Sequence, residues 1–432
     1  MQRTDAERDL LRRADRALPQ GSLGNMRLDE EYAFIVRQGR GSHVWDVSGN
    51  EYVDYLLGSG PMILGHAHPA VIAAVEEAAR KGTTFFTQNV YAIELAEAII
   101  DAVPCAEMVR FTTSGTDATF QCLRLARART GRDKVMKFEG GFHGTHDYAQ
   151  MSVTPDQPPP YPAPAPSSAG IPQAVADTVL IAPYNDVETA ADIIERNRND
   201  LAAVIVEPLQ RILEPRPGFL EGLREVTERN GVALVFDEVV TGFRLAYGGA
   251  QERYGVVPDM AAFGKIVGGG MPLGAVAGKR EFLAAYDASA APADGHVGQI
   301  GTMNGSPVAA AAGLATLKEL RAPGIYDAYN ATGARLRRSL QTMLDDAGVD
   351  ATVSGDDVLF DIFFTPQPIT DYRSTLTADK RLNAVFNQTL LDRGVFKPAG
   401  KVYVGMCHTD ADVEQTLAAF EAGVAAVSGQ AR

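Results

Sequence analysis

Short apolar runs rich in Val, Ile and Phe alternate with longer stretches of helical periodicity over the central two-thirds of the chain. This alternation is typical of a parallel sheet covered by helices, and no other feature constrains the fold as strongly. The predicted strands are Met108–Thr112, Lys134–Phe138, Thr178–Ile181, Ala203–Val206, Ala233–Phe236 and Met260–Phe263. The predicted helices are Asp117–Arg129, Val187–Arg196, Gly218–Asn230 and Val308–Leu320. We therefore expect one large α/β domain.

The two ends of the chain predict a second, smaller α+β domain. Short strands are expected over Tyr32–Val36, His43–Asp46 and Tyr52–Asp54, and near the C-terminus the helices Ala331–Ala347 and Asp379–Arg393 bracket strands around Val358–Phe364. We place the N-terminal segment and part of the small domain at residues 1–60, the large domain at 61–325 and the rest of the small domain at 326–432.

The segment Pro155–Pro172 reads PDQPPPYPAPAPSSAGIP, and neither a helix nor a central strand accommodates so many prolines. It is predicted to be an extended surface loop. Two roles stay open for it: a stiff spacer or an active-site flap.

The net charge limits the classes of binding partner, and the cysteine content indicates the cellular compartment. With 40 basic against 54 acidic residues, the formal charge of −14 argues against nucleic acid and membrane surfaces as partners. Three scattered cysteines, Cys105, Cys122 and Cys407, do not make a disulfide framework, which favours a reducing compartment. Met1–Pro19 lacks the apolar core of a secretory signal and predicts an amphipathic helix instead. We expect a cytoplasmic protein.

Lys265 follows an apolar strand and precedes three consecutive glycines, Gly268-Gly269-Gly270. A lysine held in such tight backbone, with little side-chain bulk around it, could form a Schiff base with a carbonyl compound. The alternative is an ordinary solvated lysine. The motif alone does not decide between them.

Further clusters support a ligand site. Asp237 ends an apolar strand, where ligands of open α/β sheets bind, and it could pair with a protonated pyridine nitrogen or merely cap a turn. Ser114-Gly115-Thr116 joins a strand to a helix and could bind a phosphate or act as an ordinary N-cap. A similar turn, Gly301–Pro307, precedes another helix. Together these features predict a phosphorylated aldehyde cofactor.

The pairs His143 with His146 and His66 with His68 raise the question of a metal. Carboxylate or cysteine ligands at zinc-like spacing do not accompany them in the sequence, so we expect no metal.

These motifs, in their order and spacing, resemble the class III aminotransferases of PLP fold type I, and within them most closely the glutamate-1-semialdehyde 2,1-aminomutases. The matching motifs are Ser114-Gly115-Thr116, Phe142-His143-Gly144, Glu207-Pro208, Asp237-Glu238-Val239 and Gly264-Lys265 with its glycines. Gly60-Pro61-Met62 and Lys137-Phe138-Glu139-Gly140 add to the likeness, which runs from about Gly21 to Ala425. The resemblance implies a large seven-stranded, mostly parallel sheet and pyridoxal 5′-phosphate (PLP) as cofactor.

The resemblance also implies roles for individual residues. Lys265 would bind PLP covalently and then transfer protons, Asp237 would pair with the pyridine nitrogen, and Phe142 and Val239 would enclose the ring. The remaining cofactor positions are Ser114, Gly115 and Thr116 at the phosphate, Thr302 from the neighbouring subunit, His143, Glu207, and Gln210 near the ring's 3′-oxygen. Because Thr302 would come from the neighbouring subunit, the resemblance also implies a homodimer with a shared active site.

The substrate residues depart from the aminomutase pattern. Arg27 aligns with the arginine that binds the substrate carboxylate, with an ordinary surface arginine as the alternative, and Gly58 and Ser59 replace a serine and a tryptophan. The C-terminal segment around Lys401 lacks both the aminomutase glutamate and the arginine of other members, and Lys401 could partly substitute for the latter. We therefore expect an aminotransferase that moves an amino group from an amino acid or amine to an oxo acid, aldehyde or ketone through pyridoxamine phosphate. The alternative is the aminomutase, and racemase or decarboxylase activity stays open.

Overall fold

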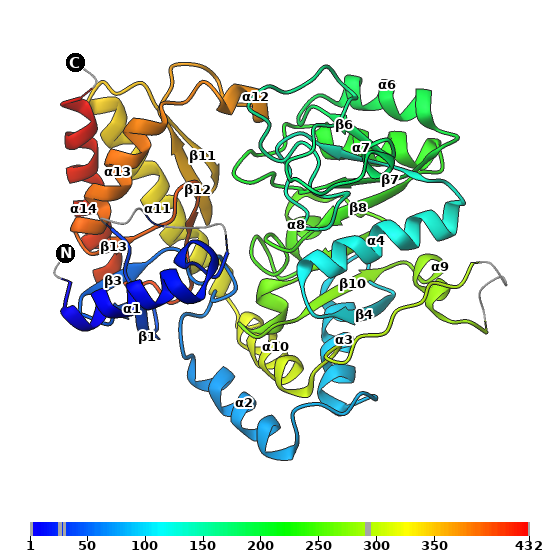
Figure 1. Cartoon of the computed structure of the whole chain (residues 1–432), viewed down its shortest axis with the longest axis horizontal. Helices are drawn as coiled ribbons and strands as arrows, with labels where there is room; N and C mark the ends of the chain where they lie inside the picture. Colours follow the sequence, from blue (N-terminus) through cyan, green and yellow to red (C-terminus); the bar gives the residue numbers. More distant parts are fainter. Residues whose placement is uncertain (1–2, 25–27, 29–31, 290–294, 431–432) are drawn as a thin grey trace.

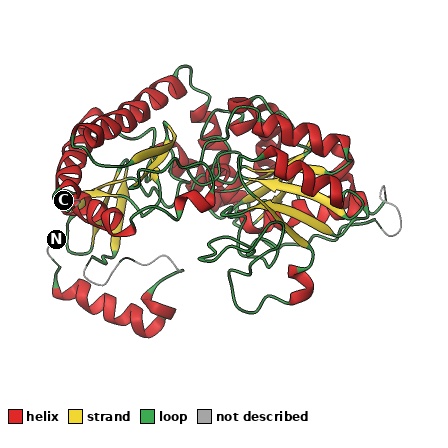
Figure 2. Cartoon of the chain, turned by 90° about the horizontal axis from the view of Figure 1, so that it is seen from above, coloured by secondary structure: helices red, strands yellow, loops and turns green. Residues whose placement is uncertain are grey.

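The structure is a computed structural model that describes residues 3–24, 28, 32–289 and 295–430. Figure 1 shows a larger part built on one wide sheet and a smaller part that contains both chain ends. In the view from above, the N- and C-termini lie on the same side, away from the wide sheet (Figure 2). No helix among the described residues has both the length and the apolar character needed to cross a bilayer.

The wide sheet has seven strands in the order β4-β10-β9-β8-β7-β5-β6. Their bounds are β4 Met108–Thr112, β5 Lys134–Phe138, β6 Val179–Ala182, β7 Leu201–Val206, β8 Ala233–Asp237, β9 Met260–Phe263 and β10 Gly274–Gly278. Only β10 pairs antiparallel with its neighbours, β4 and β9. The predicted α/β fold with a mostly parallel seven-stranded sheet is confirmed.

Apolar side chains alternate between the two faces of the sheet, as the pleat requires. In β8, Val235 packs on one face with Cys122 of α4 (Gly115–Thr130), whereas Leu234 and Phe236 pack on the other face with Leu223. The helices α3 (Val90–Ala102), α6 (Val187–Asn197), α7 (Phe219–Arg229) and α10 (Pro307–Leu320) contribute to the second face, and α2 (Pro69–Lys81) packs on α10. Both faces are thus covered, as a parallel sheet needs.

The smaller part combines elements from both ends of the chain. Its sheets have the orders β1-β2-β3-β13 and β11-β12-β14, and β13 pairs parallel with β3. Their bounds are β1 Val36–Arg40, β2 His43–Asp46, β3 Glu51–Asp54, β11 Thr352–Asp356, β12 Leu359–Phe363, β13 Val395–Phe396 and β14 Val402–Tyr403. The helices are α1 Asp5–Ala17, α11 Ile325–Asp346, α12 Tyr372–Thr375, α13 Lys380–Asp392 and α14 Asp410–Ser428. The domain boundaries after residues 60 and 325 stay a prediction.

Three details of the strand prediction are wrong or incomplete. The first strand is Val36–Arg40 rather than Tyr32–Val36. Phe34 explains the error: its ring stacks on Tyr52 with centroids 4.9 Å apart, so its apolar character serves packing, whereas the polar residues after it form the backbone ladder. The predicted strand Thr178–Ile181 lies one residue later, at Val179–Ala182. Strand β10 was not predicted, because its sequence, GAVAG, is poor in residues with strand preference.

The proline-rich segment forms a loop without helix or strand, as predicted. It is fastened to the smaller part of the molecule by α12. Arg373 forms an ion pair with the buried carboxylate of Glu139 at 2.8 Å and donates to Pro159 O at 2.7 Å. Tyr161 donates to the same carboxylate at 2.7 Å, with its ring 4.1 Å from the Arg373 guanidinium carbon. The loop therefore joins the end of β5 to the C-terminal region.

We predict that Arg373→Ala lowers the free energy of unfolding by about 2 kcal/mol, because the buried Glu139 carboxylate loses its charged partner. Arg129→Ala is the matched control, since Arg129 and its partner Glu281 are both exposed, and we expect a loss below about 0.5 kcal/mol. Urea unfolding followed by circular dichroism measures both. Equal losses in the two variants would contradict the proposed fastening role.

Candidate active site

Five strands of the wide sheet end at one edge. One candidate site residue lies at or shortly after the carboxyl end of each strand. Ser114 follows β4, Phe142 follows β5, Glu207 follows β7, Asp237 ends β8 and Lys265 follows β9. The parallel arrangement brings these residues together, because the carboxyl ends of parallel strands share one edge. This edge is the candidate active site.

The N-terminus of α4 provides an anion site at this edge. The Ser114 hydroxyl accepts from Asp117 N at 3.1 Å and caps the helix, so the N-cap that the sequence left open as one of two roles is formed. The backbone N–H groups of Gly115 and Thr116 lie in the first turn, where a helix supplies them with no internal acceptor. Gly144 packs so closely on Thr116 that a Cβ there would lie 2.6 Å from the Thr116 hydroxyl. These groups could hold a phosphate.

Two glycines allow the loop that carries Lys265 to pack closely against α4. A Cβ at Gly115 would lie 2.8 Å from the methyl groups of Val239, and a Cβ at Gly264 would lie 3.2 Å from Val239 and 3.3 Å from the Gly115 Cα. Larger residues would therefore separate the three segments. The contact places Lys265, directly after Gly264, next to the anion site.

Asp237 is held by two hydrogen bonds that fix its carboxylate. Its Oδ2 lies 2.8 Å from His143 Nδ1, and its Oδ1 accepts from Val239 N at 3.1 Å. Both side chains of the Asp237–His143 pair are buried. His143 Nε2 is buried without a hydrogen-bond partner in the structure. The histidine weighed as a metal ligand in the sequence thus contacts Asp237, and it would act on a cofactor through that carboxylate.

Lys265 combines strained backbone with a perturbed amine. Its φ of 51° lies in the left-handed region, which non-glycine residues seldom occupy. Burial lowers its pKa, the nearby Lys401 ammonium lowers it further, and Tyr403, Asp237 and Glu207 oppose the shift. A lowered pKa increases the fraction of uncharged amine, the form that attacks a carbonyl.

An aromatic face and a free acceptor complete the candidate cofactor site. Phe142 is 38% exposed, and its backbone N–H donates to Glu207 Oε2 at 3.0 Å. The Gln210 amide donates to Glu139 O at 2.8 Å, while its buried Oε1 has no partner. An open ring face, an orphaned acceptor and a first-turn anion site match a flat, phosphorylated pyridine ring, so the residues present fit PLP.

Lys137 is a residue to which sequence reasoning assigned no role, although it belongs to a motif already noted. It is 1% exposed, and its ammonium donates to the carbonyls of Gly141, Ala149 and Met151 at 2.8, 3.2 and 2.5 Å. Burial lowers its pKa to about 7. These three bonds hold the loop that carries Phe142. Lys137 shows no sequence signal beyond a charged residue between apolar neighbours in a strand that also begins with a lysine, Lys134.

The remaining candidates lie around the site or outside it. Ser59 occupies a tight turn with φ of 68°, and the next residue, Gly60, packs on the Tyr403 ring. Lys401 is buried, with its ammonium 5.9 Å from the Tyr403 ring centre. Thr302 is exposed in a turn before α10. Arg27 lies outside the described residues.

Comparisons with known proteins agree with this geometry. The family model Aminotransferase class-III matches residues 26–423. A glutamate-1-semialdehyde 2,1-aminomutase from Methanothermobacter thermautotrophicus is 43% identical over 419 residues, covering 96% of this chain and 97% of the relative.

Two solved structures extend the comparison. The structure of an omega-transaminase from Sphaerobacter thermophilus has a TM-score of 0.92 and 35% identity, and the match covers 98% of each chain. A structure described as a transaminase with PLP bound has a TM-score of 0.90 and 30% identity, with 100% of this chain and 99% of that chain covered. The chain belongs to the class III aminotransferases of PLP fold type I, and its cofactor is pyridoxal 5′-phosphate.

Proposed function

We propose that the chain is a glutamate-1-semialdehyde 2,1-aminomutase, which moves an amino group within one molecule and yields 5-aminolevulinate. The observation that carries this proposal is the 43% identity, over nearly the full length of both chains, to a curated aminomutase. A second curated aminomutase, from Desulfitobacterium hafniense, is 41% identical over 94% of each chain. The residues of the substrate pocket alone favour an intermolecular transaminase. The identity to curated aminomutases favours the aminomutase, and we give it more weight.

Bound PLP supplies an electron-withdrawing ring that makes the hydrogen on the substrate's amine-bearing carbon acidic. The chain's residues do the rest. Asp237, oriented by His143, would hold a proton on the pyridine nitrogen, and the Lys265 amine would take the carbon-bound proton and return it to a different carbon. The first-turn amides of Gly115 and Thr116 would anchor the phosphate. Phe142 and Val239 would exclude water from the two ring faces.

Intermolecular transamination is the second candidate function. Its support is the likeness to the Sphaerobacter omega-transaminase, together with the substitutions in the substrate pocket. Gly58 and Ser59 leave the pocket without the indole of the aminomutases, and the segment around Lys401 lacks their glutamate. These changes affect the substrate end of the site and leave the cofactor end intact.

A second copy of this chain is the partner we propose. Large apolar side chains gather where the start of α3 meets the turn before α10: Phe85, Phe86, Val90, Ile93, Ile300 and Met303 are all between 45% and 88% exposed. The two segments touch, since the Asn89 amide donates to Gly305 O at 2.8 Å. Soluble monomers seldom expose so large an apolar patch. Thr302 lies in the same turn, from which it would reach the phosphate site of a partner.

Lys401 would bind a substrate carboxylate. Its side chain is buried, and among the described residues it makes no hydrogen bond and no ion pair. Burial and the guanidinium groups of Arg211 and Arg244 lower its pKa to about 7. A buried cation without a counter-ion is costly, which favours loss of the Lys401 proton, and an incoming carboxylate would favour the charged ammonium form again.

The first test separates the two candidate functions. Incubated with glutamate-1-semialdehyde and no added amino donor, the PLP-loaded protein is expected to release 5-aminolevulinate, detected by mass spectrometry. Lys265→Ala should abolish the product. Absence of 5-aminolevulinate, together with release of oxo acid from alanine or glutamate, would reject the aminomutase in favour of the transaminase.

For the dimer, we expect Ile300→Glu to shift the protein to monomers, because Ile300 is 88% exposed and its charged replacement would be buried in the interface. Sedimentation velocity measures the change. Val257→Glu is the control, since Val257 is also exposed but lies outside the proposed interface. A dimeric Ile300→Glu variant, or a monomeric wild type, would contradict the interface.

The lowered pKa of Lys401 predicts a pH dependence of stability. Between pH 7 and 10.5 the unfolded chain keeps the Lys401 proton that the folded chain has released, so stability from this group rises with pH. Lys401→Met should therefore reduce the slope of unfolding free energy against pH by up to about 1.4 kcal/mol per pH unit in this window. Denaturant titrations at several pH values measure the slope. Identical slopes in both proteins would show that Lys401 is not desolvated.

A further inference from the structure

Arg211 occupies a backbone position that favours glycine. Gln210 and Leu213 form a tight turn through two hydrogen bonds, Gln210 N to Leu213 O at 3.1 Å and Leu213 N to Gln210 O at 2.8 Å. Arg211 and Ile212 are the two residues between them, and Arg211 has a φ of 61°. A non-glycine residue with φ > 0 at the first position of such a turn is strained. The strain points to a need for this side chain.

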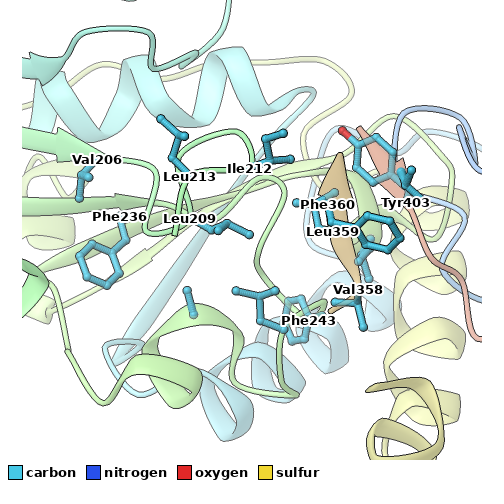
Figure 3. Close-up of a cluster of buried hydrophobic side chains, with 14 of the residues drawn as sticks. Val206, Leu209, Ile212, Leu213, Phe236, Phe243, Val358, Leu359, Phe360 and Tyr403 are labelled. Atoms are coloured by element: carbon cyan, nitrogen blue, oxygen red, sulfur yellow. The ribbon is translucent and has the colours of Figure 1, made fainter. Parts of the chain in front are cut away.

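The residues around Arg211 fix the turn in the core. Leu209, Ile212 and Leu213 are each less than 5% exposed. Figure 3 shows them in a cluster with Phe236 from β8 and with Leu359 and Phe360 from β12, so the turn is anchored to both parts of the molecule. Only Arg211 is left exposed.

The guanidinium lies at the border of the candidate active site. Its central carbon is 5.6 Å from the ring centre of Phe142, the residue that would stack on the cofactor. Arg211 also lines a cavity of about 350 Å³, which shares Gln210 with the candidate active site and whose wall carries the carboxylates of Asp156, Asp361 and Asp379. The side chain is therefore placed between the cofactor end of the site and an open volume.

The basic side chains at the border of the candidate active site are not all paired with a carboxylate of the protein. Arg211 is the nearby charge with the largest effect on Lys401, whose side chain is more than nine-tenths buried and has no hydrogen-bond or ion-pair partner in the described ranges. Arg244 is already occupied by Tyr329 and by the carbonyls of Gly60 and Val404. Glu207 and Asp237 act on Lys401 in the opposite direction, but among the described residues neither carboxylate forms an ion pair with Arg211 or Lys401. An anionic ligand would balance the remainder.

We propose that Arg211, together with Lys401, binds a carboxylate of the substrate and so makes the site specific for amino acids and oxo acids over uncharged amines, aldehydes and ketones. The inference rests on the proposed amino-transfer function. The planar guanidinium can donate two parallel hydrogen bonds to a carboxylate, and Lys401 adds a point charge. The tight turn holds the Arg211 backbone close to Phe142, so the guanidinium reaches the border of the site although the residue is exposed.

Arg211→Gly provides the test, because glycine suits the turn and removes only the side chain. Binding of glutarate, an unreactive dicarboxylate, to the PLP-loaded protein is measured by isothermal titration calorimetry. We expect the dissociation constant for glutarate, and the KM for glutamate-1-semialdehyde, to rise about tenfold or more. The thermal midpoint should stay the same or rise, since the strain is relieved, and kcat and the PLP dissociation constant should change by less than about threefold. Arg211→Lys should fall between the wild type and the glycine variant.

Arg216→Ala is the matched control, since Arg216 is an exposed arginine on the same loop. It should bind glutarate like the wild type. Wild-type affinity in Arg211→Gly, no glutarate binding by the wild type, or equal weakening in Arg216→Ala would each overturn the proposal. Loss of PLP in Arg211→Gly would also overturn it, by showing a structural role. If the protein released no 5-aminolevulinate, the proposed aminomutase function would fail, but the glutarate titration would still test whether Arg211 binds a carboxylate.

Discussion

A Cβ atom at Gly115 would meet the methyl groups of Val239 at 2.8 Å, and a Cβ at Gly264 would meet the same side chain at 3.2 Å. Three loops from three strands therefore approach each other closely because two of them carry no side chain at the contact. The approach sets Lys265 beside the amino end of α4 and leaves Val239 facing the space between them. The other groups of the site depend on this contact for their relative positions.

The smaller part of the molecule also contributes to the site. Tyr403 and Lys401 come from the C-terminal region, as does Arg373, which pairs with Glu139 directly after β5. The hydrophobic cluster of Figure 3 is continuous between the wide sheet and β12. The proposed substrate end of the site would thus lie where the two parts of the molecule pack together, and a pocket at such a junction can change its specificity without disturbing the cofactor end.

Sequence reasoning placed its candidate cofactor residues at one edge of the sheet because those residues follow strands that are largely apolar. Asp237 and Lys265 stand at the ends of such runs, where the parallel topology leaves little choice of position. It missed β10, whose small residues carry no strand signal, and it misplaced the first strand because Phe34 packs without joining a ladder. The roles of Lys137 and Arg211 depend on contacts between distant segments. The substrate preference was the hardest to predict, since a few pocket substitutions pointed to one activity while the chain as a whole resembles aminomutases.

The central claim is that Lys265 is the residue that bonds to PLP. The most direct test is to reduce the PLP-loaded protein with sodium borohydride, digest it and locate the added mass by tandem mass spectrometry. We predict a single phosphopyridoxyl group on the peptide that contains Lys265. A label on Lys401 or Lys137, or no label on any lysine, would contradict the account.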